Sequence, residues 1–186
     1  MTQHLHPIST VSAGLWTANA TTLHGDTDEG VDSPDDEATY AETDTDAQDM
    51  ELLLEPGIDP LTGDGHVLQW RARQHGIGIG ATELTVALYQ GAGLIATGVA
   101  SHTTTYSTAS YLLTAAEANA ITNYADLRVR VRVVLPSGTA HVHVTALELD
   151  IPSLDLHASQ RGALVTPSSF GEVAQPLARG EVKDTR

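Results

Sequence analysis

Residues 127–151 read LRVRVRVVLPSGTAHVHVTALELDI, and this stretch decides the fold class. From Leu127 to Val133 aliphatic residues alternate strictly with arginines, which is the period of a β-strand with one buried and one solvent-facing side. Pro136 to Gly138 supply turn chemistry, and a second alternating run follows them. We therefore expect a long antiparallel hairpin, which is typical of a β-sandwich or barrel.

The second alternating run changes phase part-way. Val142 and Val144 share one parity, whereas Leu147 and Leu149 share the other. One extra residue in a strand shifts all later side chains to the opposite faces. The sequence therefore predicts a β-bulge near Thr145-Ala146.

The rest of the chain repeats this pattern in shorter pieces. Alternating runs such as 66–75 and 82–90 are separated by segments rich in glycine and proline. Thr114 and Glu117 have the spacing of a capping box, which predicts a short helix ending near Asn123. About eight short strands and one helix predict an all-β fold, an antiparallel β-sandwich or jelly roll.

We expect one sandwich domain over residues 14–151 with an extended arm at each end. The N-terminal arm, residues 1–13, is polar, and the C-terminal arm, residues 152–186, carries only scattered apolar residues. The second arm is too sparse to build its own core and too apolar for a plain linker, so we expect it to dock on a partner. Its candidate partner-binding residues are Leu164, Val165 and Phe170.

The composition excludes several classes of partner. The 186 residues carry a formal net charge of -15, and every lysine and arginine lies at or beyond Arg71. Nucleic-acid binding needs a basic surface, so we expect none. The chain has no cysteine, which excludes disulfides and thiolate metal sites. We also expect no membrane partner, because no apolar run approaches the roughly 18 residues that span a bilayer and the first residues lack a secretory pattern.

An acidic loop is the best candidate for binding a cation. Asp26, Asp28, Asp32 and Glu37 resemble the spacing of a calcium loop. Such a loop needs glycine at its sixth position, where this chain has Val31, and it needs flanking helices. We therefore interpret the loop as solvated and expect no metal or cofactor. If calcium does bind, its candidate ligands are Asp26, Asp28 and Asp32.

His141 and His143 are two residues apart, so they share one face of a strand. This spacing can chelate zinc or nickel, but no third ligand is evident nearby in sequence. We favour the alternative that these histidines belong to a wet or partner-facing strand surface.

A basic stripe crosses this acidic chain, formed by Arg128, Arg130 and Arg132. Arg71 and Arg73 would extend the stripe if their strand were its neighbour. The stripe is either a docking face for an acidic partner, including the acidic loop of another copy, or one side of cross-strand ion pairs. In the second case the expected partners are Glu148 and Asp150 on the neighbouring strand.

Catalysis finds no support in the sequence. It contains no serine nucleophile elbow, phosphate loop or HExxH motif. Two carboxylates can suffice for a glycosidase, but the acids concentrate in loop sequence with few aromatic neighbours. Trp70 lies on an inward parity and is expected in the core rather than on a sugar platform. We expect a protein without enzymatic activity.

Four segments carry a resemblance to a known family: DSPDDEATY (32–40), WRAR (70–73), LTVALYQGAGLIAT (84–97) and LTAAEANAITNYADLRVRV (113–131). With them, the run from Leu15 to Ile151 resembles small β-sandwich, jelly-roll-like virion structural proteins of tailed bacteriophages. The resemblance carries no active site. It implies a head decoration, head–tail or tail accessory subunit that is made in the bacterial host cytoplasm. Such a subunit would form homo-oligomers and bind other virion proteins through its sandwich faces and arms. The alternative is a carbohydrate-binding or adhesion module on the same fold.

Overall fold

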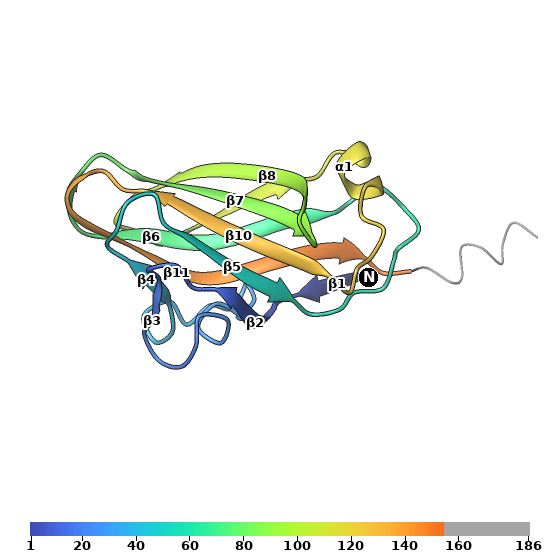
Figure 1. The fold of residues 1–186 in the computed structure, drawn as a ribbon, viewed down its shortest axis with the longest axis horizontal. Helices are drawn as coiled ribbons and strands as arrows, with labels where there is room; N and C mark the ends of the chain where they lie inside the picture. Colours follow the sequence, from blue (N-terminus) through green and yellow to red (C-terminus); the bar gives the residue numbers. More distant parts are fainter. Residues whose placement is uncertain (155–186) are drawn as a thin grey trace, which may run out of the picture. The chain divides into compact units, whose positions relative to one another are not determined.

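The computed structural model describes residues 1–154, without the side chains of residues 78, 79 and 139, and these residues form two antiparallel sheets packed face to face (Figure 1). The six-stranded sheet has the order β3-β4-β11-β6-β9, with β1 also pairing to β11, and the five-stranded sheet has the order β2-β5-β10-β7-β8. The predicted all-β sandwich is confirmed.

The six-stranded sheet contains β1 (Thr2–Leu5), β3 (Thr17–Ala18), β4 (Ala41–Thr43), β6 (Val67–Ile79), β9 (Ser107–Leu112) and β11 (Ser137–Pro152). The five-stranded sheet contains β2 (Pro7–Ser12), β5 (Asp49–Leu54), β7 (Thr82–Gln90), β8 (Gly93–His102) and β10 (Leu127–Val134). The described residues include one helix, α1 (Ala115–Asn119). Within residues 1–154 no helix is long and apolar enough to cross a membrane.

The alternation in β10 predicts its facing correctly but not its partners. Val129 and Val131 are fully buried, and the arginines that alternate with them point outward. However, β10 pairs with β5 and β7, whereas β11 pairs with β6, β4 and β1 in the other sheet. The predicted hairpin is therefore wrong: the turn after β10 carries the chain from one sheet to the other, at the same end as the β6–β7 connection (Figure 1). Alternation tells which side of a strand faces the core, not which strand lies beside it.

The predicted bulge in β11 is confirmed. The register between β11 and β6 shifts between Val144 and Ala146. Beyond the shift Leu147 and Leu149 enter the core. Glu148 and Asp150 consequently lie on the opposite side, the outer face of the six-stranded sheet. This phase change places the two acids where the site described below is formed.

The helix begins as predicted and ends earlier. The Thr114 side chain accepts a hydrogen bond from the Glu117 backbone N–H, and the Glu117 carboxylate accepts one from the Thr114 backbone N–H at 2.7 Å. This reciprocal pair is the capping box. The helix ends at Asn119 rather than near Asn123.

Residues 1–13 do not form the predicted polar arm. Instead, β1 pairs with residues 149–152 of β11 and β2 pairs with β5, so the N-terminal segment adds a strand to each sheet. Leu5 is anchored in the core. The physical reason is that unpaired strand edges offer backbone hydrogen bonds even to a short polar segment. Except for its first three residues, the predicted C-terminal arm (152–186), with Leu164, Val165 and Phe170, lies outside the described residues.

The core lies between the two sheets. Trp70 is buried as expected, and its indole Nε1 donates to His102 Nε2 at 3.1 Å. Gly98 on β8 makes room for this ring, because a Cβ there would lie 2.7 Å from the Trp70 ring. Large aliphatic side chains from both sheets, among them Met50 and Leu147, complete the packing.

Candidate functional site

The arginine stripe forms the centre of an open face, the outer face of the five-stranded sheet. Arg130 and Arg132 lie directly opposite Glu51 and Asp49 in the pairing of β10 with β5. Arg130 Nη2 donates to Glu51 Oε2 at 2.7 Å, and Arg132 Nη1 donates to Asp49 Oδ2 at 3.2 Å. Arg128 Nη1 adds a contact of 3.4 Å to Glu51 Oε1. Arg128 and Arg130 therefore share the Glu51 carboxylate, Arg128 also binds Asp126 at 3.2 Å, and Arg132 pairs separately with Asp49.

The predicted partners of the stripe are wrong, although cross-strand pairing itself is present. Glu148 and Asp150 lie on β11, in the other sheet, and cannot reach β10. Arg71 and Arg73 lie on β6 of that same sheet, so they do not extend the stripe. The misassignment follows from the predicted hairpin, which would have placed β10 beside β11.

The open face changes character across its strands. In each cross-strand row a β5 residue is followed by one residue each from β10, β7 and β8. The rows are Asp49–Arg132–Thr85–Val99, Glu51–Arg130–Ala87–Thr97 and Leu53–Arg128–Tyr89–Leu94. In these rows β10 and most of β5 carry charged side chains, whereas β7 and β8 carry uncharged ones.

A depression of about 200 Å³ lies where the charged and the uncharged parts of the open face meet. Its lining residues are Asp49, Thr85, Ala87, Tyr89, Leu94, Thr97, Arg130 and Arg132. The Arg130 guanidinium lies 4.5 Å from the Tyr89 ring centroid, a cation–π contact, and the hydrogen bond with Glu51 raises the pKa of Arg130. These contacts hold planar polar groups in fixed orientations beside an aromatic ring. Such an arrangement can donate and accept several hydrogen bonds at once.

The edge of this face is apolar. β8 is the edge strand of the five-stranded sheet, and its Leu94 and Val99 side chains are 58% and 56% exposed. Exposed apolar side chains on an edge strand are a surface that another chain can pair with or cover.

The opposite outer face, on the six-stranded sheet, is partly covered by the β3–β4 loop (residues 19–40). Arg71 binds Asp36 through two hydrogen bonds of 2.7 Å, and Arg73 binds Glu37 at 2.7 Å. The hydrogen bonds from Arg71 lower the pKa of Asp36. The Tyr106 hydroxyl donates to the Asp36 carbonyl at 2.9 Å. The acidic loop therefore docks on arginines of its own chain.

The suggested calcium ligands are not brought together. Asp26 is fully buried, and its carboxylate accepts hydrogen bonds from the Ala20 and Thr21 backbone N–H groups at 2.7 and 2.9 Å. Asp28 and Asp32 are exposed at other points of the loop. The Asp26 carboxylate is occupied in closing the loop, so its spacing from the other acids reflects a turn and not a metal site.

His141 and His143 lie on the outer face of β11, as their spacing predicts, but in different surroundings. His143 is buried and stacks on Tyr40, with the ring centroids 3.9 Å apart. Burial lowers the pKa of His143 to about 3, and the nearby His75, Arg73 and His141 add to this shift. His75 lies across from His141 in the register of β6. The structure therefore explains His143 as a packed, neutral ring.

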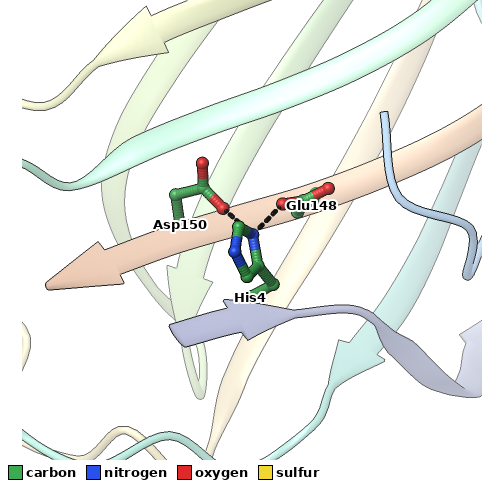
Figure 2. Close-up of side chains that lie close together, drawn as sticks. All are labelled: His4, Glu148 and Asp150. Atoms are coloured by element: carbon green, nitrogen blue, oxygen red, sulfur yellow. Dashed lines mark hydrogen bonds and ion pairs between the residues drawn. The ribbon is translucent and has the colours of Figure 1, made fainter. Parts of the chain in front are cut away.

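A third cluster joins β1 to β11 (Figure 2). His4 is directly opposite Asp150 in the strand register. His4 Nδ1 lies 2.5 Å from Glu148 Oε1 and 2.7 Å from Asp150 Oδ1. The hydrogen bond with Glu148 raises the pKa of His4, while burial and the neighbouring Glu148 raise the pKa of Asp150 to about 6. Each of these three residues offers one atom that can bind a metal ion, and the three atoms all lie within 4.8 Å of one another.

Sequence reasoning missed this cluster. His4 fell in the predicted arm, and Glu148 and Asp150 were assigned to the arginine stripe. One signal was present: two acids spaced by two follow the predicted bulge, so they share a face opposite to the core. The third member lies at the other end of the chain, and no local pattern indicates it.

The comparisons with known proteins assign no family. No family model and no curated protein matches the chain. Solved structures give distant likenesses, among them the C-terminal carbohydrate-binding module of family 6 from the laminarinase LamC of Zobellia galactanivorans. It is 12% identical with a TM-score of 0.46, over 80% of this chain and 98% of that one.

Two further likenesses are of the same kind. The family 29 carbohydrate-binding module of Piromyces equi is 9% identical with a TM-score of 0.40, over 87% of this chain and 97% of that one. The enzymatically active domain of tailspike protein 4 of bacteriophage CBA120 is 10% identical with a TM-score of 0.41, over 80% of this chain but 19% of that one. Similarity at this level carries no argument about what this chain binds.

Proposed function

We propose that this chain is a non-catalytic binding module that recognises carbohydrate on the outer face of its five-stranded sheet. The observation that carries the proposal is the depression in which Tyr89, Arg130 and Asp49 meet. Specific binding sites combine an apolar or aromatic surface with a few oriented polar groups, and this depression has both.

The chemistry of the face fits a neutral, polyhydroxylated ligand. Sugar rings present C–H groups on their faces and hydroxyls on their edges. Tyr89 and Leu94 offer the apolar surface, and the Arg130–Glu51 pair offers donors and acceptors at its border. Because the arginines are already paired with acids of β5, the face does not favour a highly charged partner. Those ion pairs also commit the carboxylates to their arginines rather than to proton transfer, which supports a binding role.

A glycan array probed with the full-length chain tests the proposal, followed by calorimetric titration of the best glycan. Tyr89→Ala should weaken binding about tenfold or more, because stacking on an aromatic ring is lost. Tyr89→Phe is the matched control and should retain most of the affinity. Arg130→Ser should also weaken binding. Absence of glycan binding, or equal affinity in Tyr89→Ala and the wild type, would overturn the proposal.

A second candidate function is a structural subunit of a tailed-phage virion, made in the cytoplasm of the bacterial host. The sequence resemblance of segments such as 113–131 supports it, and so do the exposed Leu94 and Val99 on the edge strand β8. An edge strand with apolar side chains can pair with another copy or with a neighbouring virion protein.

Mass spectrometry of purified particles, followed by incorporation of variants, separates the two candidates. Val99→Asp places a charge on the edge strand without touching the core, so it should fold and fail to enter particles. Ser101→Asp, on the same strand but outside the apolar pair, is the control. Full incorporation of Val99→Asp would contradict assembly through β8.

A further inference from the structure

We propose that His4, Glu148 and Asp150 bind a divalent transition-metal ion of the zinc class. The site joins the first strand of the described chain to the last, β1 to β11, on the outer face of the six-stranded sheet (Figure 2). It does not depend on the carbohydrate proposal, which concerns the other sheet.

The electrostatics of the cluster favour a bound cation. Glu148 and Asp150 lie two residues apart on one strand face, and their side chains are only 4% and 18% exposed. Two carboxylates held close together out of water cannot both stay ionised unless a positive charge compensates them. Within the described residues, the ion-pair partner of both is His4, whose ring is half exposed. A dication at this point would compensate both carboxylates together, which a single imidazolium cannot.

The orientation of the ligand atoms also favours a metal ion. Glu148 Oε2 accepts a hydrogen bond from the Val31 backbone N–H at 3.1 Å, and Asp150 Oδ2 accepts one from Gln69 Nε2 at 2.7 Å. Each carboxylate is thus anchored through one oxygen and directs the other toward His4. Asp150 Oδ1, the oxygen facing the site, is buried, and the polar atom that it meets there is His4 Nδ1, 2.7 Å away. Anchoring of this kind is how outer-shell contacts orient metal ligands.

The set of ligand atoms selects the type of ion. One imidazole nitrogen and two carboxylate oxygens suit zinc and neighbouring first-row metals. Calcium and magnesium prefer ligands that are all oxygen, so an imidazole at the centre disfavours them. The three donors come from both strands, and all their ligand atoms lie within 4.8 Å of one another.

The site also has room for a fourth ligand. A pocket of about 150 Å³ adjoins it, lined by His4, His6, Gly30, Asp32, Ser33 and Glu148. A zinc site with three protein ligands takes a water or another donor in the fourth position. The pocket can hold that water. Asp32 and His6 also line the pocket, and the side chain of either offers a further ligand atom for the metal.

Metal binding here would fasten β1 to the sandwich. The pairing of β1 with β11 covers four residues of β1, from Thr2 to Leu5, and His4 is the point where the metal would bridge the two strands. A ligand that binds only the folded state stabilises it. The bound ion should therefore slow backbone hydrogen exchange across β1 more than in the rest of the sheet.

The test uses the full-length chain, freed of metal with a chelator, and titrates ZnCl₂ calorimetrically at pH 7.5. One equivalent should bind, and CoCl₂ should give the visible absorption bands of a cobalt site with nitrogen and oxygen ligands. His4→Ala and Asp150→Asn should weaken zinc binding about tenfold or more. His141→Ala is the matched control, because this histidine lies on β11 away from the cluster, and it should bind as the wild type does.

Hydrogen exchange provides the second readout. Zinc should protect residues 2–5 in the wild type and in His141→Ala, but not in His4→Ala. The proposal is overturned if zinc does not bind, if His4→Ala binds zinc like the wild type, or if His141→Ala loses the zinc. Calcium binding with equal or higher affinity than zinc would also overturn it.

Discussion

The two outer faces of the sandwich differ in what lies over them. On the five-stranded sheet the arginines of β10 pair with Glu51 and Asp49 and stay open to solvent. On the six-stranded sheet the β3–β4 loop lies against Arg71 and Arg73, and His143 is buried. Both faces come from strands with the same alternation of apolar and polar residues. The comparison shows that strand alternation alone does not tell whether a polar strand face stays open to a partner, because a loop of the same chain can cover it.

The largest expected effect concerns β10. Its alternation of apolar and polar residues, which strands of both sheets share, is taken to decide which side chains are buried. Val131→Asp places a charge on the fully buried side of this strand. It should lower the free energy of unfolding by about 4 kcal/mol or more, which prevents soluble folding. Arg130→Ser, on the open side, should fold and melt close to the wild type. Soluble expression and thermal melting measure both, and similar behaviour of the two variants would contradict the assigned facing.

The covered face should show a pH dependence that the open face lacks. The pKa of His143 is about 3 in the folded protein, lowered mainly by burial, against an ordinary value of 6.5. The unfolded chain therefore binds the proton more tightly than the folded protein does. The contribution of neutral His143 to the free energy of unfolding is fully present above about pH 6.5 and is lost as the pH falls toward 3. Between pH 7 and pH 5, protonation of this histidine in the unfolded chain should lower the free energy of unfolding by about 2 kcal/mol.

Urea unfolding of the wild type and of His143→Phe at both pH values measures this contribution. The substituted phenyl ring would still stack against Tyr40 but cannot take up a proton, so the variant's loss of stability between pH 7 and pH 5 should be smaller by that amount. Glu42 Oε2, 3.3 Å from His143 Nε2, works against the effect by favouring the protonated ring. Other buried histidines, such as His66 and His102, contribute equally to both proteins. An identical pH dependence in the two proteins would show that His143 is not a neutral packed ring.

A smaller effect concerns the loop that covers the six-stranded sheet. Asp36→Ala removes a two-point ion pair with Arg71 in a partly buried setting. We expect the free energy of unfolding to fall by about 1–2 kcal/mol, with faster hydrogen exchange over residues 24–40. Glu37→Ala removes a more exposed pair with Arg73 and should cost less, about 0.5 kcal/mol. Equal effects of the two variants would mean that Asp36 does not hold the loop in place.

Local patterns predicted much of this fold. The alternation of β10, the bulge at Thr145-Ala146 and the capping box at Thr114 each depend on a few adjacent residues, and the structure contains all three. The predictions that were wrong concern non-local contacts. The partners of β10, the strands formed by residues 1–13, and the coverage of one face by residues 19–40 all depend on contacts between distant segments.

The candidate sites show the same division. The outward side of the stripe at Arg128, Arg130 and Arg132 could be read from the sequence, because strand period fixes it. The cluster of His4 with Glu148 could not, since 144 residues separate them and only the pairing of β1 with β11 brings them together. The composition favours the acidic loop as a cation site, whereas the structure brings possible ligand atoms together at His4, Glu148 and Asp150.

We propose that the open face of the five-stranded sheet is the ligand-binding surface. The measurement that tests this proposal is the affinity of Tyr89→Ala for the best glycan found on the array, compared with Tyr89→Phe and the wild type, with all three shown to melt alike. We expect the affinity to fall about tenfold or more in Tyr89→Ala and to stay close to that of the wild type in Tyr89→Phe. Unchanged affinity in Tyr89→Ala would show that the ligand binds elsewhere and that the open face is not the binding surface.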